Sequence, residues 1–220
     1  RIPYRETIRG QGSSKYRHKK QSGGAGQIAE VWMRIESKSR GDGVEFVHSL
    51  VGQNEDRVFV PSVEKGVNAA CTEGVLAGYR VVDVKADFYD GKQHPVDSKD
   101  IAFQMAGKQA FREAFMQSQP CLLEPILDIE IKVPEDFMGD VMGDMSSRRG
   151  KIMGMDAEGT FQLIKAQAPQ SEMYQYSTTL RSLTGGRGIH SEKFSHYEEV
   201  PRDMESKVIA ESKVSQEEES

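Results

Sequence analysis

The sequence predicts an α+β fold in two parts, and three observations predict it. Over residues 4–50, apolar and polar side chains alternate in short runs bounded by glycine, which is typical of half-buried strands. Between residues 61 and 119, two segments instead show the apolar spacing of helices. After Pro120, the order strand, helix, strand, strand, helix, strand is that of the ferredoxin-like split βαβ.

The first part is expected to contain four strands before its first helix. Alternating apolar residues and glycine turns, such as the turn at 40–43, set their bounds. The strands are expected at residues 4–8, 15–21, 27–37 and 44–50. The helix should begin after Pro61, because apolar residues then recur at helical spacing up to Gly74, and we expect it to end near Gly78.

A fifth strand and a second helix complete the first part. The strand is expected at residues 79–88, with a turn at Asp90-Gly91. Its alternating apolar residues are Val82, Val84, Ala86 and Phe88. Ser98 can cap the second helix, whose apolar face would carry Phe103, Ala106, Ala110 and Ala114. We expect this α+β domain to cover residues 1–119.

The second part is expected at residues 125–205, after a linker at 120–124 that prolines bound. In βαββαβ order, its elements are expected at 126–133, 138–150, 151–156, 160–168, 173–185 and within 188–200. Its first helix carries an apolar stripe that we interpret as core, because methionine commonly fills cores. The stripe consists of Met138, Val141, Met142 and Met145. Residues 206–220 should form a fraying helix and an acidic tail.

Charge is distributed unevenly along the 220 residues. The net charge of −5 and the pI near 5.6 argue against coating nucleic acid by bulk charge, so any such binding must be local. Within residues 1–27 the only acidic residue is Glu6. The cations there are Arg1, Arg5, Arg9, Lys15, Arg17, Lys19 and Lys20. The N-terminal segment therefore supplies a local basic surface.

We predict no catalytic residue and no metal site in this chain. Gly23, Gly24 and Gly26 lack the order of a P-loop and precede a strand rather than a helix. Cys71 and Cys121 have no neighbouring Cys or His cluster, which favours a reducing, cytoplasmic setting over a disulfide or zinc site. The sequence has no apolar run long enough for a membrane span and no signal peptide. It begins without Met, which indicates a piece of a longer protein.

Residues 15–27 join a basic strand to a glycine loop. Glycines at 23, 24 and 26 permit positive φ and leave amide N–H groups unshielded, while the lysines and arginine before them supply charge. This combination predicts contact with a phosphate backbone. The alternative is an ordinary glycine turn beside a solvated charged strand.

Short motifs along the chain occur in the order of one known family. They are Pro3-Tyr-Arg-Glu-Thr-Ile8, Lys20-Gln-Ser-Gly-Gly24, His94-Pro-Val-Asp-Ser98, Gly139-Asp-Val-Met-Gly-Asp144, Ser147-Arg-Arg-Gly150, Leu180-Arg-Ser-Leu-Thr184, Gly186-Arg-Gly188 and His196-Tyr-Glu-Glu-Val-Pro201. The chain therefore resembles the C-terminal domains IV and V of translation elongation factor G over essentially its whole length. The resemblance implies an S5-like fold for the first domain and a ferredoxin-like fold for the second.

The resemblance also implies where the chain contacts RNA. Two loops of the first domain would form a tRNA-mimicking tip that enters the decoding site of the small ribosomal subunit and holds the tRNA–mRNA duplex during translocation. The implied contact residues are Lys19, Lys20, Gln21, Ser22, Gly23, Gly24, Gly26, Gln27, His94, Pro95, Val96, Asp97 and Ser98. His94 is expected to make a hydrogen-bonding or stacking contact rather than to act as an acid or base.

The second domain would lie near the stalk base of the large subunit. Arg148, Arg149, Arg181 and Arg187 could contact RNA there, or could form a solvated sheet edge or interdomain salt bridges. We expect a monomer without a cofactor of its own. GTP and Mg²⁺ would bind a GTPase domain in a missing N-terminal part, and the chain alone should not hydrolyse GTP.

The sequence departs from the family pattern at both loops. Where the family commonly reads Gln-Ser-Gly-Gly-Arg-Gly-Gln-Tyr-Gly, this chain has Ala25, Ile28 and Ala29 in place of Arg, Tyr and Gly. Pro95 replaces an Asp and stiffens the chain after His94. A paralogue acting in ribosome recycling or ribosomal protection is therefore a second hypothesis. A protein-interaction module without RNA contact is a third.

Overall fold

The computed structural model describes residues 1–22, 25–52, 55–94 and 98–219. The chain divides into a larger unit of residues 4–123 and 199–220 and a smaller unit of residues 1–3 and 124–198. Within the described ranges, no helix is long and apolar enough to cross a membrane.

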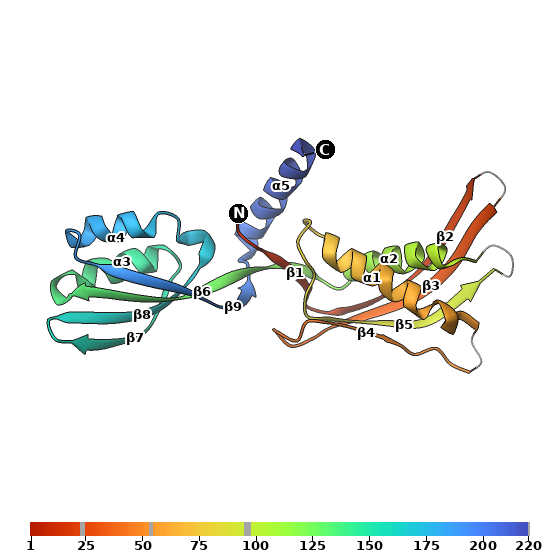
Figure 1. Ribbon diagram of the computed structural model, residues 1–220, viewed down its shortest axis with the longest axis horizontal. Helices are drawn as coiled ribbons and strands as arrows, with labels where there is room; N and C mark the ends of the chain where they lie inside the picture. Colours follow the sequence, from red (N-terminus) through yellow and green to blue (C-terminus); the bar gives the residue numbers. More distant parts are fainter. Residues whose placement is uncertain (23–24, 53–54, 95–97, 220) are drawn as a thin grey trace. The chain divides into compact units, whose positions relative to one another are not determined.

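The larger unit is built on a four-stranded sheet. The strand order is β2-β3-β5-β4, with bounds Gln11–Ser22, Ala25–Ser37, Val84–Gln93 and Val44–His48. Neighbouring strands are antiparallel except β4 and β5, which are parallel. Helices α1 (Val60–Glu73) and α2 (Asp100–Met116) lie side by side on one face of the sheet (Figure 1). A 3-10 turn at Glu55–Phe59 precedes α1.

The core of the larger unit lies between these helices and the sheet. The alternating residues of β3 that face the helices are fully or almost fully buried, namely Ala29, Val31, Met33 and Ile35. The Phe59 and Phe103 rings stack with centroids 4.1 Å apart. Helices α1 and α2 approach closely at Gly66, where an added Cβ would lie 2.1 Å from the carbonyl oxygen of Gln104. Glycine is thus required at this helix crossing.

Three local expectations for this unit are wrong. The chain does not turn at Asp90-Gly91, because β5 continues to Gln93. A register shift between β3 and β5 lets the strand continue, because Met33 pairs with Phe88 while Trp32 pairs with Asp90. Helix α1 ends at Glu73, not near Gly78, because Gly74 takes φ +79° and its N–H still bonds the carbonyl of Ala70. Ser98 is not the cap of α2, since Lys99 is its N-cap residue and makes no side-chain cap bond.

A buried carboxylate organises the chain after α1. Glu6 lies in strand β1 (Arg5–Ile8) and is wholly inaccessible to solvent. Its two carboxylate oxygens accept hydrogen bonds of 2.7 to 2.9 Å from backbone N–H groups. The donors are Val75, Leu76, Ala77 and Tyr79. One side chain therefore holds the whole turn between α1 and the following segment.

The C-terminal segment is an ordered part of the larger unit. Helix α5 (Arg202–Glu218) includes most of residues 206–220, for which we expected a fraying helix and an acidic tail. Its apolar residues Met204, Val208 and Ile209 pack on a small core that contains Ala77 and Leu122. The expected helix is confirmed, because these residues recur at helical spacing on one face. The expected tail is wrong, since the helix continues to Glu218.

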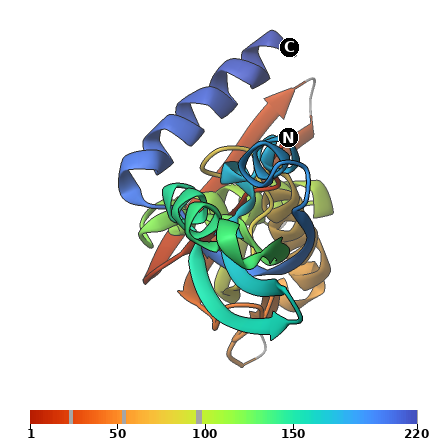
Figure 2. The same ribbon diagram turned by 90° about the vertical axis from the view of Figure 1, so that its left-hand side faces the viewer.

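The smaller unit has the predicted βαββαβ order. Its elements are β6 (Pro120–Pro134), α3 (Met138–Ser147), β7 (Lys151–Glu158), β8 (Phe161–Pro169), α4 (Tyr176–Thr184) and β9 (Ile189–Glu199). Short 3-10 turns at Glu135–Phe137 and Gln170–Glu172 precede the two helices. In the sheet β9 pairs with β6, β6 with β8 and β8 with β7. Both helices lie on the same side of that sheet (Figure 2).

The predicted fold class is confirmed, with one correction between its parts. Residues 120–124, expected as a linker, are the beginning of β6, whose first residues pair with β1 in the larger unit. The strand tolerates Pro120 because this proline stands at its first position. The methionine stripe is core as expected, with Val141 and Met145 buried and its other two members packed against the same cluster.

Both cysteines are free and buried, and we expect them to be chemically inert in the folded chain. Burial raises the pKa of Cys71 to about 12 and that of Cys121 to about 11. The thiolate is the reactive form, so native thiols should react with a disulfide reagent at neutral pH about a hundredfold or more slowly than in denaturing urea. Because folding raises these pKa values, the two thiols contribute fully to the free energy of unfolding below pH 9. This contribution falls as the pH rises toward 11. Native reaction as fast as free cysteine would contradict this.

Candidate nucleic-acid interface

The basic segment forms the outer half of a long hairpin. Strands β2 and β3 stay paired up to Ser22 opposite Ala25. Gly23 and Gly24 lie outside the described residues. Gln21, Ser22, Gly26 and Gln27, which we expected in the loop, are strand residues.

Lys19 and Lys20 stand on this hairpin just before its end. Lys19 is opposite Ile28 and Lys20 is opposite Gln27, so the two ammonium groups point to opposite faces of the hairpin. Both side chains are exposed, and neither forms an ion pair with a carboxylate of the described residues. The end of the hairpin thus presents positive charge that the fold does not use.

The second predicted loop is tied to the same hairpin. The Ser98 hydroxyl accepts a hydrogen bond of 2.6 Å from the His94 backbone N–H and donates one of 2.6 Å to the carbonyl of Ile28. Ile28 lies directly opposite Lys19, so the structure brings the described residues of both predicted loops together. Pro95, Val96 and Asp97 lie outside the described residues.

His94 is exposed and follows the last residue of β5. It borders a small hollow of about 120 Å³ on the hairpin. The hollow is lined by Arg17, Ile28, Glu30, Lys92, Gln93 and His94. Three of these six side chains are cationic or become so on protonation, which suits an anionic or hydrogen-bonding ligand. The role of His94 as an RNA contact stays a prediction.

Two of the four arginines predicted in the second domain have partners inside the smaller unit. Arg148 donates to the Asp144 carboxylate at 3.0 Å and to the Glu172 carbonyl at 2.7 Å, and its guanidinium lies 5.0 Å from the Tyr176 ring centroid. Arg149 makes a bidentate contact with Glu124, at 2.8 and 3.2 Å. These contacts favour a structural role for both residues, within the unit rather than between domains.

The Arg149 pair is mostly buried. The Glu124 side chain is only 3% exposed, and Arg149 also bonds Glu172 at 3.2 Å. Burial alone lowers the pKa of Arg149, but the hydrogen bonds and charges of Glu124 and Glu172 raise it above its ordinary value. Arg149 is thus held charged by two carboxylates. No sequence pattern indicated this pairing.

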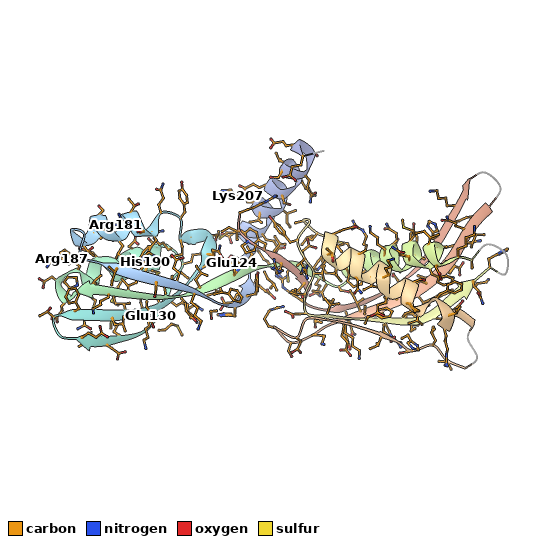
Figure 3. All side chains as sticks on the ribbon, in the orientation of Figure 1. Glu124, Glu130, Arg181, Arg187, His190 and Lys207 are labelled. Atoms are coloured by element: carbon orange, nitrogen blue, oxygen red, sulfur yellow. The ribbon has the colours of Figure 1, made fainter. Side chains whose placement is uncertain are left out.

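The remaining two arginines are exposed at one end of the smaller unit. Arg181 lies on α4 and Arg187 lies in the turn after that helix (Figure 3). Arg181 bonds the Ser177 hydroxyl, and the Arg187 guanidinium lies 4.9 Å from the Phe137 ring centroid. Of the four predicted arginines, these two are the exposed ones.

The described residues contain no group of three or more His, Cys, Asp or Glu side chains that could hold a metal ion.

Comparisons with known proteins agree for both parts of the chain. The family described as elongation factor G, domain IV, matches residues 1–119, and the one described as elongation factor G C-terminus matches residues 121–208. The chain is 49% identical to elongation factor G of Aquifex pyrophilus over 210 residues, which are 96% of this chain and 30% of that protein. It is also similar to a crystal structure of a Thermus thermophilus protein, with TM-score 0.86 and 38% identity over 96% of this chain and 32% of that one.

These matches define the class as a translation elongation factor. Within that class, the chain belongs to the elongation factor G family. It spans about a third of the length of the relatives it matches.

Proposed function

We propose that this chain is the ribosome-binding part of an elongation factor G-like GTPase that promotes movement of tRNA and mRNA in the cytoplasm. The end of the β2–β3 hairpin would enter the decoding site of the small subunit. The observation that carries the proposal is the Ser98 bridge, which joins the His94 loop to the hairpin beside two lysines that have no carboxylate partner among the described residues. The family membership supports the same assignment.

The chemistry of the hairpin end suits contact with an RNA backbone without recognition of the base sequence. Lys19 and Lys20 can neutralise phosphates, and strand-end backbone groups can approach a sugar–phosphate edge. Such contacts recognise shape and charge, so they act on every codon alike. A translocase requires that sequence independence.

The smaller unit would contact the large subunit near its stalk base. Arg181 and Arg187 are the exposed candidates, whereas Arg148 and Arg149 serve the fold. GTP and Mg²⁺ would bind a domain outside these 220 residues. We expect the chain alone to show no saturable GTP hydrolysis. Such hydrolysis would contradict the assignment of GTP binding to another domain.

The double variant Lys19→Glu, Lys20→Glu tests the proposal. Loss of two phosphate contacts should weaken binding to small ribosomal subunits by about a hundredfold at moderate salt, because each charge-assisted contact contributes about 1.5 kcal/mol. The slope of log affinity against log salt should become shallower by about 2. Binding can be measured by co-sedimentation over a salt series.

The matched control is Lys207→Glu, Lys213→Glu, which makes the same charge change at exposed positions of α5. It should bind like wild type. If the Lys19 and Lys20 variant also binds like wild type while it stays folded, the hairpin is not the contact. Binding insensitive to both salt and these changes would favour the protein-interaction module.

A recycling or ribosomal protection role is the second candidate. The specific observation in its favour is the altered tip sequence, with Ala25 and Pro95 at positions where the family commonly has Arg and Asp. Translocation and subunit-splitting assays on the full-length protein distinguish the two. Splitting without translocation would replace the first proposal by the second.

A further inference from the structure

The sheet face turned away from the helices carries a row of basic residues on β2. Ser14 donates its hydroxyl to the Ala110 carbonyl of α2, so it faces the helices. Side chains alternate along a strand, and therefore Lys15, Arg17 and Lys19 all face the opposite side. Lys15 and Arg17 each have 56% of the side chain exposed. This open face extends back from the hairpin end.

Neighbouring strands hold this row in place. The Lys15 Nζ atom lies 4.4 Å from the centroid of the Trp32 ring, directly across the strand pair. Glu30 lies 3.9 Å from Lys15 Nζ and 3.6 Å from Arg17 Nε, and only 14% of its side chain is exposed. Lys92 of β5 is opposite Glu30 on its other side. Lys92 is exposed, and its ammonium group has no carboxylate partner among the described residues. Glu30 is thus surrounded by cations.

The excess positive charge is confined to the hairpin half of the open face. There, Lys15, Arg17, Lys19 and Lys92 outnumber Glu30 and Asp90. Toward the other end of the strands, cations and carboxylates pair off. Arg34 Nε lies 2.9 Å from Asp87, and Lys85 Nζ lies 3.8 Å from Glu36. The open face therefore offers one anion-binding region, continuous with the hairpin end.

We propose that Lys15, Arg17 and Lys92, three of the open-face cations, bind the sugar–phosphate backbone of an RNA strand that runs along β2. Residues two apart on a strand are separated by about 7 Å, which is close to the spacing of successive phosphates along RNA. Lys15 is already held over Trp32, so less side-chain freedom is lost on binding. The inference rests on the proposed function and extends it from the hairpin end to a second contact surface.

The test uses the 220-residue chain and protein-free small-subunit ribosomal RNA. The open-face variant Lys15→Gln, Arg17→Gln, Lys92→Gln removes these three cations and leaves Lys19 and Lys20 intact. The control Lys65→Gln, Lys207→Gln, Lys213→Gln removes the same charge from exposed positions elsewhere in the larger unit. Filter binding between about 50 and 200 mM salt gives the dissociation constant and the salt slope of each.

We expect the salt slope of the open-face variant to be shallower than that of wild type by about 2 to 3, since each lost phosphate contact contributes about 0.7 to 0.9. The control should keep the wild-type slope. An open-face variant with wild-type affinity and slope would overturn the inference. So would weaker binding to whole subunits with unchanged RNA binding, which would indicate a ribosomal protein on this face. The Lys19 and Lys20 variant tests the hairpin end separately from the open face. Failure of the proposed function can therefore be distinguished from failure of this inference.

Discussion

Replacing Glu6 with alanine is expected to lower the free energy of unfolding of the larger unit by about 3 to 5 kcal/mol. Glu6 is fully buried and accepts four backbone N–H groups. Alanine leaves these donors without an acceptor, and each unsatisfied donor that stays away from water costs about 1 to 3 kcal/mol. The turn after α1 would reorganise, and with it the surface on which α5 packs.

Trp32 makes this measurement specific to the larger unit. It is the only tryptophan of the chain and lies in β3, so its fluorescence during urea unfolding follows that unit. Glu64→Ala, at an exposed position of α1, is the matched control and should change stability by less than about 0.5 kcal/mol. A Glu6→Ala chain within about 1 kcal/mol of wild type would show that the amides find other acceptors.

Replacing Arg149 with methionine is expected to cost the smaller unit about 3 to 5 kcal/mol. The change leaves Glu124, of which only 3% of the side chain is exposed, as a buried charge without its bidentate partner. Circular dichroism during unfolding can follow the loss in a chain whose larger unit is unchanged. Trp32 fluorescence should give the wild-type transition.

The double variant Glu124→Met, Arg149→Met separates charge burial from packing. Removing both charges abolishes the desolvation penalty, so the double variant should regain most of the stability lost by Arg149→Met alone. Strictly additive losses would contradict the pairing. If Arg149→Met instead leaves stability unchanged and weakens RNA binding, the structural role assigned to Arg149 is wrong.

The periodic spacing of apolar residues predicted the fold better than any single residue did. The helical spacing from Val63 onward and the methionine stripe of α3 both describe faces that the structure buries. Local turn signals were less reliable. Asp90-Gly91 is a strong turn signal, yet strand pairing with β3 carries β5 through it, because an irregularity at Trp32 and Met33 absorbs the mismatch.

The candidate site was predictable in outline and not in its contacts. Composition and motifs indicated the two loops, but no sequence spacing reveals that the Ser98 hydroxyl bonds Ile28, 70 residues away. Arg148 and Arg149 were ambiguous for the same reason, because each also bonds a residue of another element, Glu172 and Glu124 respectively. Glu6 lies in the motif Pro3-Tyr-Arg-Glu-Thr-Ile8, and only the fold shows that its carboxylate accepts backbone N–H groups after α1.

Directed hydroxyl-radical probing on the ribosome tests the central claim most directly. Ser22→Cys places a new thiol at the last residue of β2, and the two native cysteines, Cys71 and Cys121, are buried. An iron chelate attached there, with the chain bound to small subunits, should cleave ribosomal RNA around the decoding site. The same chelate at Lys207→Cys, on α5, should leave that region intact. Equal binding with no decoding-site cleavage from Ser22→Cys would contradict the account.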